Sequence, residues 1–370
     1  MTNDHTTTGP ARLTGLSGEA AAVSSQLSSF AFSSDRMDTA RNIAVWREAV
    51  ATLFDVDDLA QGEPGPFRAD VRSYAMGPVL IGLSRASGQR FRRTAETVAR
   101  SGVDHIILQL YLKGGFDGVA GLRPTRVRAG DICLFDLAQT LETRAVAFEN
   151  VTLVVPRPLL GDHLLRVEDL HGLVLPGSSV IARLLAGHLS ALLESAPRMS
   201  LHECQSVVEG TVSLLAACLR NEIESSDVEP GATAGPSLIR IRQYIESQLA
   251  TEELSANSVA AHFGMSRASL YRLFAPAGGI ADYIRSRRLH RAFFDLANSG
   301  GRGPRISEVA RRWRLGTDAH FTRSFKAAYG ITPRAAREAA LLGLQRGTDG
   351  ASNATISRWM REIAPPRAAD

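Results

Sequence analysis

The chain has 370 residues, of which 44% are hydrophobic and 22% charged, as in a globular protein with room for two or three domains. No apolar run approaches the ~20 residues of a membrane helix, and the N-terminus (MTNDHTTTGPARLTG) lacks the basic-then-apolar order of a secretory signal, so we expect a cytoplasmic protein without a membrane partner. Three scattered cysteines without a CxxC pair argue against a disulfide framework or a structural zinc site.

The net charge of +4 hides an uneven distribution. Between Pro236 and Arg346 there are 18 basic and 8 acidic residues, so this segment is strongly positive and the rest of the chain is negative. A basic C-terminal third is typical of a nucleic-acid-binding module.

The first two thirds of the chain predict a leader followed by a β-rich domain. Residues 1–35 are rich in Ser, Thr, Ala and Gly and are expected to be disordered. Helical spacing of apolar residues begins at Ile43. Residues 66–160 mix short apolar runs with Gly, Asp and Pro, which indicates antiparallel strands in a small barrel or sandwich. We predict a hairpin turn at residues 128–131.

Helical spacing returns over residues 160–224, where two apolar stripes predict an antiparallel helix pair. The stripes are Val180, Leu184, Leu185, Leu189 and Leu192, and Val207, Val208, Val212, Leu215 and Cys218. Such a pair either covers the β-rich unit or packs against a second copy of the chain. Residues 225–237 read as an interdomain linker, and residues 346–370 as a tail with a short helix near 355–364.

The C-terminal segment 238–345 contains one pattern twice, as VAAHFGMSRASLYRLF from Val259 and as VARRWRLGTDAHFTRSF from Val309. Each copy reads as a short helix, a tight turn and a second helix with exposed polar side chains. This is the pattern of a helix-turn-helix, whose second helix enters the major groove of DNA. We therefore predict an all-α domain that reads two successive major-groove segments about 10 base pairs apart.

In the first unit, Gly264 suits a left-handed turn and Ser266 suits the N-cap of the second helix. Leu270 and Phe274 should face the core, which leaves a polar outer face for DNA. The predicted base contacts on this face are Ala268, Tyr271 and Arg272, and the predicted backbone contact is Arg267.

The second unit and the helix before it supply the remaining predicted contacts. The helix near residues 280–296 carries Arg285, Arg287 and Arg288, which we expect on phosphates, although a solvated face is the alternative. The second recognition helix starts near Thr317. Its predicted base contacts are Asp318, Ala319, Thr322 and Arg323, and its predicted backbone contacts are Lys326 and Arg334.

Residues 254–337 resemble the AraC/XylS-type DNA-binding domain. The resemblance lies in LSANSVAAHFGMSRASLYRLF, in GGIADYIRSRRLHRAFFDL and in ISEVARRWRLGTDAHFTRSFKAAYGITPRAAR, with the ending Tyr329-Gly330-Ile331-Thr332-Pro333. Residues 40–160 resemble, more loosely, the sensory and dimerisation half of such regulators, in WREAVATLF, the Gly–Asp turn and VVPRPLL.

This resemblance implies a cupin-like β-barrel with flanking helices over residues 36–224, serving in sensing and dimerisation. It also implies a bacterial regulator, usually an activator, that binds promoter DNA as a homodimer beside RNA polymerase and responds to a small-molecule effector. One position departs from the family pattern, because Arg314-Leu315 stands where the second turn usually has Gly-Phe. A non-glycine residue in a left-handed turn is strained, unless Gly316 shifts the turn.

Two other functions compete with an effector-controlled regulator. An enzyme, such as a cupin fused to a DNA-binding domain, would need a reactive cysteine or a metal site. Cys133 and Cys218 lie in apolar patterns, Cys204 is little different, and no HxH pair occurs, so we expect neither catalysis, nor a metal, nor a cofactor. A regulator controlled only by its abundance is compatible with the same sequence.

A barrel interior lined by Ile107, Leu108, Leu110, Leu134 and Leu153 would be apolar, or simply a filled core. Arg90, Arg92 and Arg93 would either hold a carboxylate at the barrel mouth or be ordinary surface charge.

Overall fold

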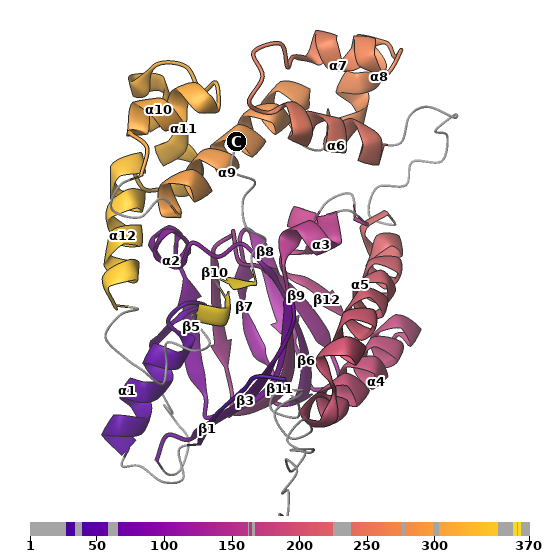
Figure 1. Cartoon of the computed structure of the whole chain (residues 1–370), viewed down its shortest axis with the longest axis vertical. Helices are drawn as coiled ribbons and strands as arrows, with labels where there is room; N and C mark the ends of the chain where they lie inside the picture. The colour runs from indigo at the N-terminus through magenta and orange to yellow at the C-terminus, as the bar shows by residue number, and fades with distance from the viewer. Residues whose placement is uncertain are drawn as a thin grey trace, which may run out of the picture.

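The computed structural model describes residues 27–33, 39–57, 66–161, 163–164, 167–224, 238–275, 278–298, 303–346, 358–360 and 362–363. A β-rich N-terminal domain carries helices on its flanks, and a helical C-terminal domain lies across one end of it (Figure 1). The predicted β-rich and all-helical parts are thus confirmed. The linker predicted at residues 225–237, and residues 1–26 of the predicted leader, lie outside the described residues.

The N-terminal strands form two antiparallel sheets. The larger sheet has the strand order β1 (Ser29–Ser33), β3 (Ala69–Met76), β4 (Val79–Ala86), β11 (Phe148–Val155), β6 (Ile106–Lys113), β9 (Ile132–Asp136) and β12 (Leu173–Leu175). The smaller sheet has the order β2 (Asp55–Asp57), β5 (Gln89–Arg93), β10 (Leu141–Ala145), β7 (Phe116–Ala120) and β8 (Arg123–Val127). Of the predicted alternatives, a small barrel or a sandwich, the structure shows two separately hydrogen-bonded sheets that do not close into one barrel.

The prediction that residues 1–35 are disordered is wrong for residues 29–33, which form strand β1. Residues 29–33 pair with β3, from Ser29 opposite Tyr74 to Ser33 opposite Asp70. Phe30 and Phe32 stand two residues apart and therefore point to one side of the strand, where Phe32 is buried. This short alternation is obscured in the sequence by the Ser-rich residues around it.

The turn at residues 128–131 forms, but it does not close a hairpin. Asp131 Oδ2 accepts the backbone N–H of Arg128 at 2.8 Å, and Gly130 takes a φ of 92°, as the turn residues predict. However, β8 belongs to the smaller sheet and β9 to the larger one. The turn therefore carries the chain between the two sheets.

Alternate residues of each strand in the larger sheet point to opposite faces. Side chains on both faces are buried, in two different cores. On β6, Ile107 faces the smaller sheet, whereas Leu108 packs with the core beneath the helices. The predicted interior lining is wrong for Leu108, Leu110, Leu134 and Leu153, which all pack in the core beneath the helices.

Two helices cover this outer core, α4 (Val180–Ser195) and α5 (Leu201–Glu224), which run along one flank of the sheets in Figure 1. Leu185 and Leu189 of α4 are fully buried there. Val180 and Leu184, predicted in the same stripe, are instead 64% and 60% exposed. The other helices of this domain are α1 (Thr39–Val50), α2 (Ala95–Ser101) and α3 (Arg157–Gly161), with a 3-10 turn at Val167–Leu170.

The C-terminal domain contains α6 (Leu238–Gln248), α7 (Ala256–His262), α8 (Arg267–Leu273), α9 (Ile280–Ala297), α10 (Ile306–Arg312), α11 (Asp318–Tyr329) and α12 (Pro333–Arg346). Helix α9 joins two small cores, one for each helix-turn-helix. The second core includes Val98 and Ala99 of α2, so the two domains share buried apolar surface.

The end of the chain returns to the N-terminal domain. Trp359, Met360 and Ile363 are buried among residues of α1 and the two sheets. Residues 358–360 are helical, within the range predicted for a tail helix. The prediction of a plain tail missed that its apolar side chains complete the core of a domain some 200 residues away in sequence.

Candidate nucleic-acid interface and interior cavity

The two helix-turn-helix units have the same backbone geometry at their turns. Gly264 has a φ of 61° and Arg314 a φ of 53°, both left-handed. The next residue donates its N–H five residues back in each unit, from Met265 to Ala260 at 3.0 Å and from Leu315 to Ala310 at 2.9 Å. The duplication seen in the sequence is therefore a duplication of structure.

Both recognition helices begin where predicted, at Ser266 and at Thr317, and both of these residues cap their helix. The Ser266 side chain accepts the N–H of Ser269 at 3.1 Å at the start of α8, and that of Thr317 accepts the N–H of His320 at 3.3 Å at the start of α11. Capping fixes the first turn of each helix, which is the part that approaches base edges in such units.

The outer faces of both helices carry the predicted contact residues. On α8, Leu270 is buried while Arg267, Ala268, Tyr271 and Arg272 are exposed. On α11, Phe321 and Phe325 are fully buried. Its predicted contact residues lie on the other side, with Asp318, Ala319, Arg323 and Lys326 exposed and Thr322 half-buried.

The arginines of α9 divide between two sides of the helix. Arg285 is exposed, and Arg288 donates from Nε to the Leu249 carbonyl at 2.9 Å. Arg287 instead points away from them and pairs with Glu246. Burial lowers the pKa of Arg287, but attraction to Glu168 and Glu246 outweighs it and raises the pKa overall.

The placement of Arg287 argues against a phosphate contact there. Its side chain is only 13% exposed, and Glu246 also accepts from Arg291 Nη2 at 3.0 Å. Arg287 thus belongs to a partly buried ion cluster between α6 and α9. The sequence contained a sign of this difference. Arg285 and Arg287 are two residues apart, which places them on different faces of a helix.

A hollow of about 540 Å³ lies between the two units, and its described lining contains no acidic residue. Arg267 and Tyr271 of α8 line it, with Arg285 and Arg288 of α9. Arg314 and His320 of the second unit complete its wall. The sequence did not predict that Arg314 and His320 would share this surface with α8.

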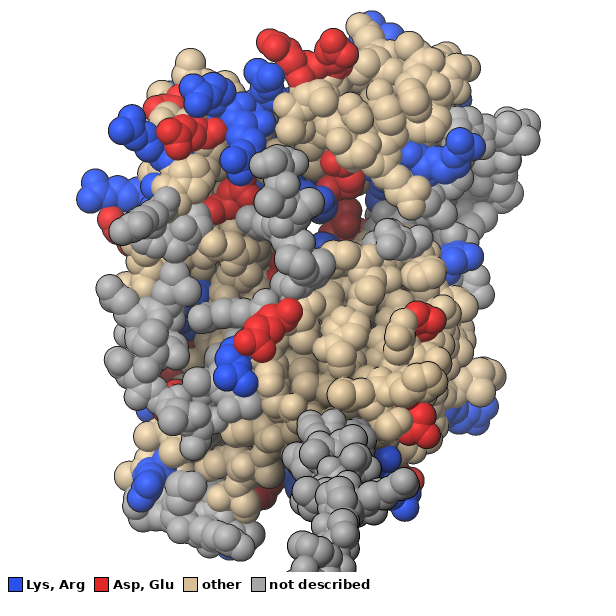
Figure 2. All heavy atoms as spheres, viewed as in Figure 1, with Lys and Arg blue, Asp and Glu red and all other residues tan. Residues whose placement is uncertain are grey.

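Basic side chains continue beyond the hollow. Lys and Arg gather over α10–α12 at the upper left of Figure 2, whereas the N-terminal domain below shows mostly uncharged surface. Arg334 of α12 is exposed and donates to Glu338 at 2.8 Å. Such a basic surface attracts a phosphate backbone.

Two family models match the two domains of the chain. One described as "Helix-turn-helix domain" matches residues 259–339, and one described as "AraC-binding-like domain" matches residues 46–220. The chain belongs to the AraC type of DNA-binding transcription regulators. The family resemblance inferred from the sequence is thus confirmed.

Relatives of this AraC-type chain include a transcriptional activator. The transcriptional activator NphR of Rhodococcus sp. is 22% identical over 302 residues, which are 80% of this chain and 89% of NphR. A protein from the nit 5′ region of Bacillus sp. (strain OxB-1) is 23% identical over 232 residues, 60% of this chain and 88% of its own. The crystal structure of the AraC-like transcriptional activator CuxR matches 72% of this chain and 95% of its own, at 27% identity and a TM-score of 0.49.

The departure at Arg314 does not shift the second turn of this AraC-type domain. Arg314 itself takes the left-handed conformation, and among the described residues other than glycine no further positive φ occurs. Its side chain reaches the first unit, where Nε donates to the Ala250 carbonyl at 3.3 Å and Nη2 lies 3.7 Å from Glu252. The position thus links the two units.

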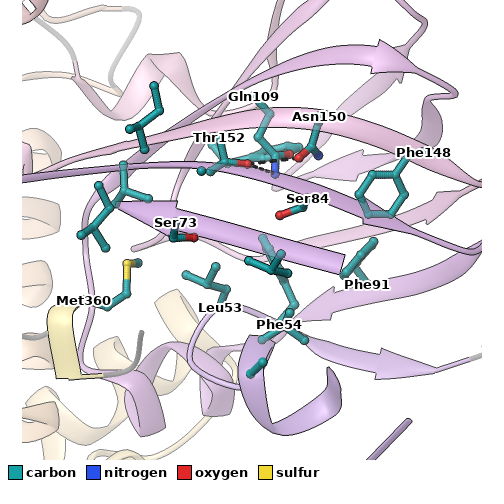
Figure 3. A pocket seen from close by; sticks show the side chains of 18 of the residues that line it. Leu53, Phe54, Ser73, Ser84, Phe91, Gln109, Phe148, Asn150, Thr152 and Met360 are labelled. Carbon is teal, nitrogen blue, oxygen red and sulfur yellow. Dashed lines mark hydrogen bonds between the residues drawn. The ribbon is translucent and has the colours of Figure 1, made fainter. Parts of the chain in front are cut away.

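The N-terminal domain of the AraC-type chain encloses a cavity of about 110 Å³ between its sheets. Aromatic side chains form much of its wall, among them Trp46, Phe54, Phe91 and Phe148. Gln109, Asn150 and Thr152 bring polar atoms to one side of it (Figure 3). Gln109 Nε2 donates to Thr152 Oγ1 at 3.3 Å.

The arginines considered for this cavity do not line it. Arg93 is fully buried, and its guanidinium donates to backbone carbonyls such as that of Leu137, at 2.8 Å from Nε. Arg90 pairs with Glu142, and Arg92 with Asp57 at 2.5 Å. None of the three lies among the described lining residues.

The described residues give no support to a reactive cysteine or a metal site. Burial raises the pKa of Cys133, and it also raises the pKa values of Cys204 and Cys218, which disfavours their thiolates. Among the described residues, no three His, Cys, Asp or Glu side chains gather as a metal site. In the same part of the chain, no helix is long and apolar enough to cross a membrane.

Proposed function

We propose that this chain is a cytoplasmic transcriptional activator that reads two successive major-groove segments with α8 and α11. One observation carries the proposal. The two helix-turn-helix units have the same turn geometry, and each presents an exposed recognition helix at the edge of the same arginine-lined hollow. A recognition helix in the major groove reads bases, while arginines between two such helices suit the phosphates of the intervening backbone.

The proposed base contacts are those that the exposed faces present. On α8 these are Ala268, Tyr271 and Arg272, of which Arg272 can make two hydrogen bonds to one guanine. On α11 they are Asp318, Ala319, Thr322 and Arg323. The proposed backbone contacts are Arg267, Arg285, Arg288, Lys326 and Arg334, without Arg287.

The interior cavity supports a response to a small-molecule effector. Ligand sites are mostly apolar with a few placed polar groups, as here. The shared core of α2 with the second unit supplies a physical connection from the sensory domain to a recognition unit. The proposal of activation rests on the name of NphR, a transcriptional activator, and the proposal of a contact with RNA polymerase rests on the family resemblance.

A homodimer is supported by apolar side chains left uncovered on the helix pair. Val180 and Leu184 of α4 and Leu201 at the start of α5 are each more than half exposed. Isologous packing of this face in a second copy would cover them. Sedimentation of the full chain, against a Leu184→Glu variant that should shift it toward monomer, tests the dimer.

The test of DNA reading compares three variants on a duplex selected from random DNA by the protein itself. Arg272→Ala and Arg323→Ala should each weaken binding to that duplex by about 1–3 kcal/mol, roughly five-fold to over a hundred-fold, and relax base preference at one position. Arg285→Ala should weaken selected and random duplexes alike and flatten the salt dependence. Equal behaviour of all three variants on both duplexes would refute these roles.

The effector response has its own readout. Affinity for the selected duplex, and transcription from a template that carries it, are measured with and without cell metabolites. A change with metabolites supports the effector-controlled activator. No change in either measurement would instead favour a regulator controlled by its abundance.

A further inference from the structure

The cavity between the sheets is lined entirely by uncharged side chains. Among the described residues around it there is no Lys, Arg, His, Asp or Glu, and burial raises the pKa of Tyr111 so that its phenol stays neutral. A charged ligand would lose its hydration without gaining a partner, which is strongly unfavourable in such surroundings. The lining therefore selects against ions.

Polar atoms gather on one side of this cavity. Gln109, Thr152 and Asn150 project from the adjacent strands β6 and β11 and form a hydrogen-bonded row, with Thr152 Oγ1 donating to Asn150 Oδ1 at 3.3 Å (Figure 3). These are long, weak hydrogen bonds between neutral groups, which a ligand can replace without leaving a buried charge. A ligand with one polar end and an apolar ring would match both walls.

The size of the cavity limits the ligand. An engineered apolar cavity of about 150 Å³ in another protein holds benzene. At about 110 Å³, the cavity here suits a single ring with a small substituent, given a modest adjustment of its walls. Met360 is one of those walls, and methionine is the side chain that adapts most readily to the shape of a neighbour.

The C-terminal segment completes the cavity. Trp359 and Met360 both line it, and they are 7% and 1% exposed. The backbone carbonyl of Met360 accepts a hydrogen bond from His105 Nε2, with the two atoms 2.6 Å apart. Docking of this segment therefore rests on burial and on a specific hydrogen bond together, and it closes the space between α1 and the sheets.

We propose that this cavity is a binding site for a neutral, single-ring molecule with one hydrogen-bonding substituent, and that Trp359 and Met360 of the C-terminal segment form part of that site. The proposal rests on the effector response proposed above and names the chemistry of the effector. The ring would lie against Phe54, Phe91 and Trp46, and its polar substituent would face Gln109 and Asn150. The C-terminal segment would exclude water from the bound ring.

The ligand chemistry is tested with single-ring probes of similar size that differ in charge. Phenol and benzamide are the neutral probes, and benzoate and benzylammonium are the charged ones, each titrated into the full chain at pH 7. Binding is followed by tryptophan fluorescence, because two of the three tryptophans, Trp46 and Trp359, line the cavity. Calorimetry on the same samples checks each affinity.

At least one neutral probe is expected to bind ten-fold or more tightly than either charged probe. Failure of both neutral probes to bind, or equal binding of benzoate or benzylammonium, would overturn the assignment of a neutral ligand. Thr152→Val, which removes the central hydroxyl of the polar row, should weaken the neutral probe that binds, at an almost unchanged side-chain volume.

The role of the C-terminal segment is tested by a charge placed on it. Met360→Asp puts a carboxylate into the apolar cavity and should reduce the affinity of the neutral probe at least ten-fold. Arg358→Asp is the matched control, because Arg358 lies two residues earlier, is 66% exposed and does not line the cavity. Equal probe affinity in wild type and Met360→Asp would overturn the participation of the segment.

Hydrogen exchange gives a second measurement in the unaltered chain, should Met360→Asp fold poorly. The amides of residues 358–360 and 362–363 are expected to exchange at least several-fold more slowly when the neutral probe is bound. Unchanged exchange at saturating probe would contradict the proposal. DNA affinity is measured on the same samples. A probe that binds without changing the DNA affinity would contradict the effector response but support the binding site. DNA binding that depends on metabolites, without binding of either neutral probe, would support the effector response but contradict the proposed ligand chemistry.

Discussion

Gly102, which ends α2, and Asn298, which ends α9, touch across the boundary between the two domains. A Cβ atom on Gly102 would come within 2.2 Å of the Asn298 side-chain oxygen. Gly102 also takes a φ of 62°, where a side chain is strained. The N-terminal domain thus meets the C-terminal domain at a position where the lack of a side chain on Gly102 allows the close approach of Asn298.

Gly102→Ala is expected to destabilise this boundary. The left-handed backbone alone costs about 1 kcal/mol for alanine, and the contact with Asn298 adds to it. Gly77→Ala is the matched control, because Gly77 has a φ of 59° with open space around its Cβ position. Denaturant unfolding should show a larger loss for Gly102→Ala, and a second change, Asn298→Ala, should recover the difference. Equal losses in the two glycine variants would contradict the tight contact.

The sequence predicted the C-terminal domain well because its signals are local. Caps such as Ser266, the left-handed Gly264 and the helical spacing of Leu270 and Phe274 all act within a few residues. The exposed faces of α8 and α11 follow directly from that spacing. Sequence alone did not show that Arg287 turns toward Glu246, because that depends on how α6 packs on α9.

The N-terminal domain was predicted less accurately because its structure depends on distant contacts. Alternation showed that residues such as Leu108 are buried, but not which of two cores they enter. The pairing of β1 with β3 and the burial of Met360 join parts of the chain that no local pattern relates. Closure into a barrel depended on pairing between edge strands, which the sequence does not specify.

Arg287→Ala should lower stability and spare DNA binding. Removing this guanidinium leaves the Glu246 carboxylate partly buried with fewer partners, at a cost of about 1–3 kcal/mol. Arg285→Ala, two residues away on an exposed face, should instead leave stability nearly unchanged and weaken DNA of any sequence. Thermal unfolding and duplex titrations on both variants separate the two roles. A loss of DNA affinity in folded Arg287→Ala equal to that of Arg285→Ala would restore Arg287 as a phosphate contact.

Arg314→Gly should loosen the two recognition units relative to each other. It removes the contacts to Ala250 and Glu252 while relieving the left-handed strain, so stability should change little. Affinity for a selected duplex should fall several-fold, and insertion of one base pair between its two half-sites should be penalised less than in wild type. Arg312→Gly, an exposed neighbour paired with Asp295 on its own unit, is the control. An unchanged spacing penalty in Arg314→Gly would show that α9 alone sets the spacing.

Acid should destabilise the N-terminal domain through His171. Its Nδ1 accepts the backbone N–H of Asp136 at 3.1 Å, and its Nε2 donates to the Thr140 carbonyl at 2.9 Å, so the buried ring is neutral. Burial lowers its pKa below the ordinary 6.5. The unfolded chain therefore binds a proton that the folded chain does not, and the free energy of unfolding falls as the pH drops below about 6.5.

Denaturant unfolding between pH 7.5 and 5.5 measures this effect. His171→Gln should unfold more easily at pH 7.5 and lose stability less steeply as the pH falls, since one proton-binding group has been removed from the unfolded state. His202→Gln removes an exposed histidine and is the control for the His-to-Gln substitution itself. His105, whose pKa burial also lowers, contributes in the same direction, so a slope should remain in His171→Gln. Identical slopes in wild type and His171→Gln would mean that His171 does not stay neutral in the folded chain.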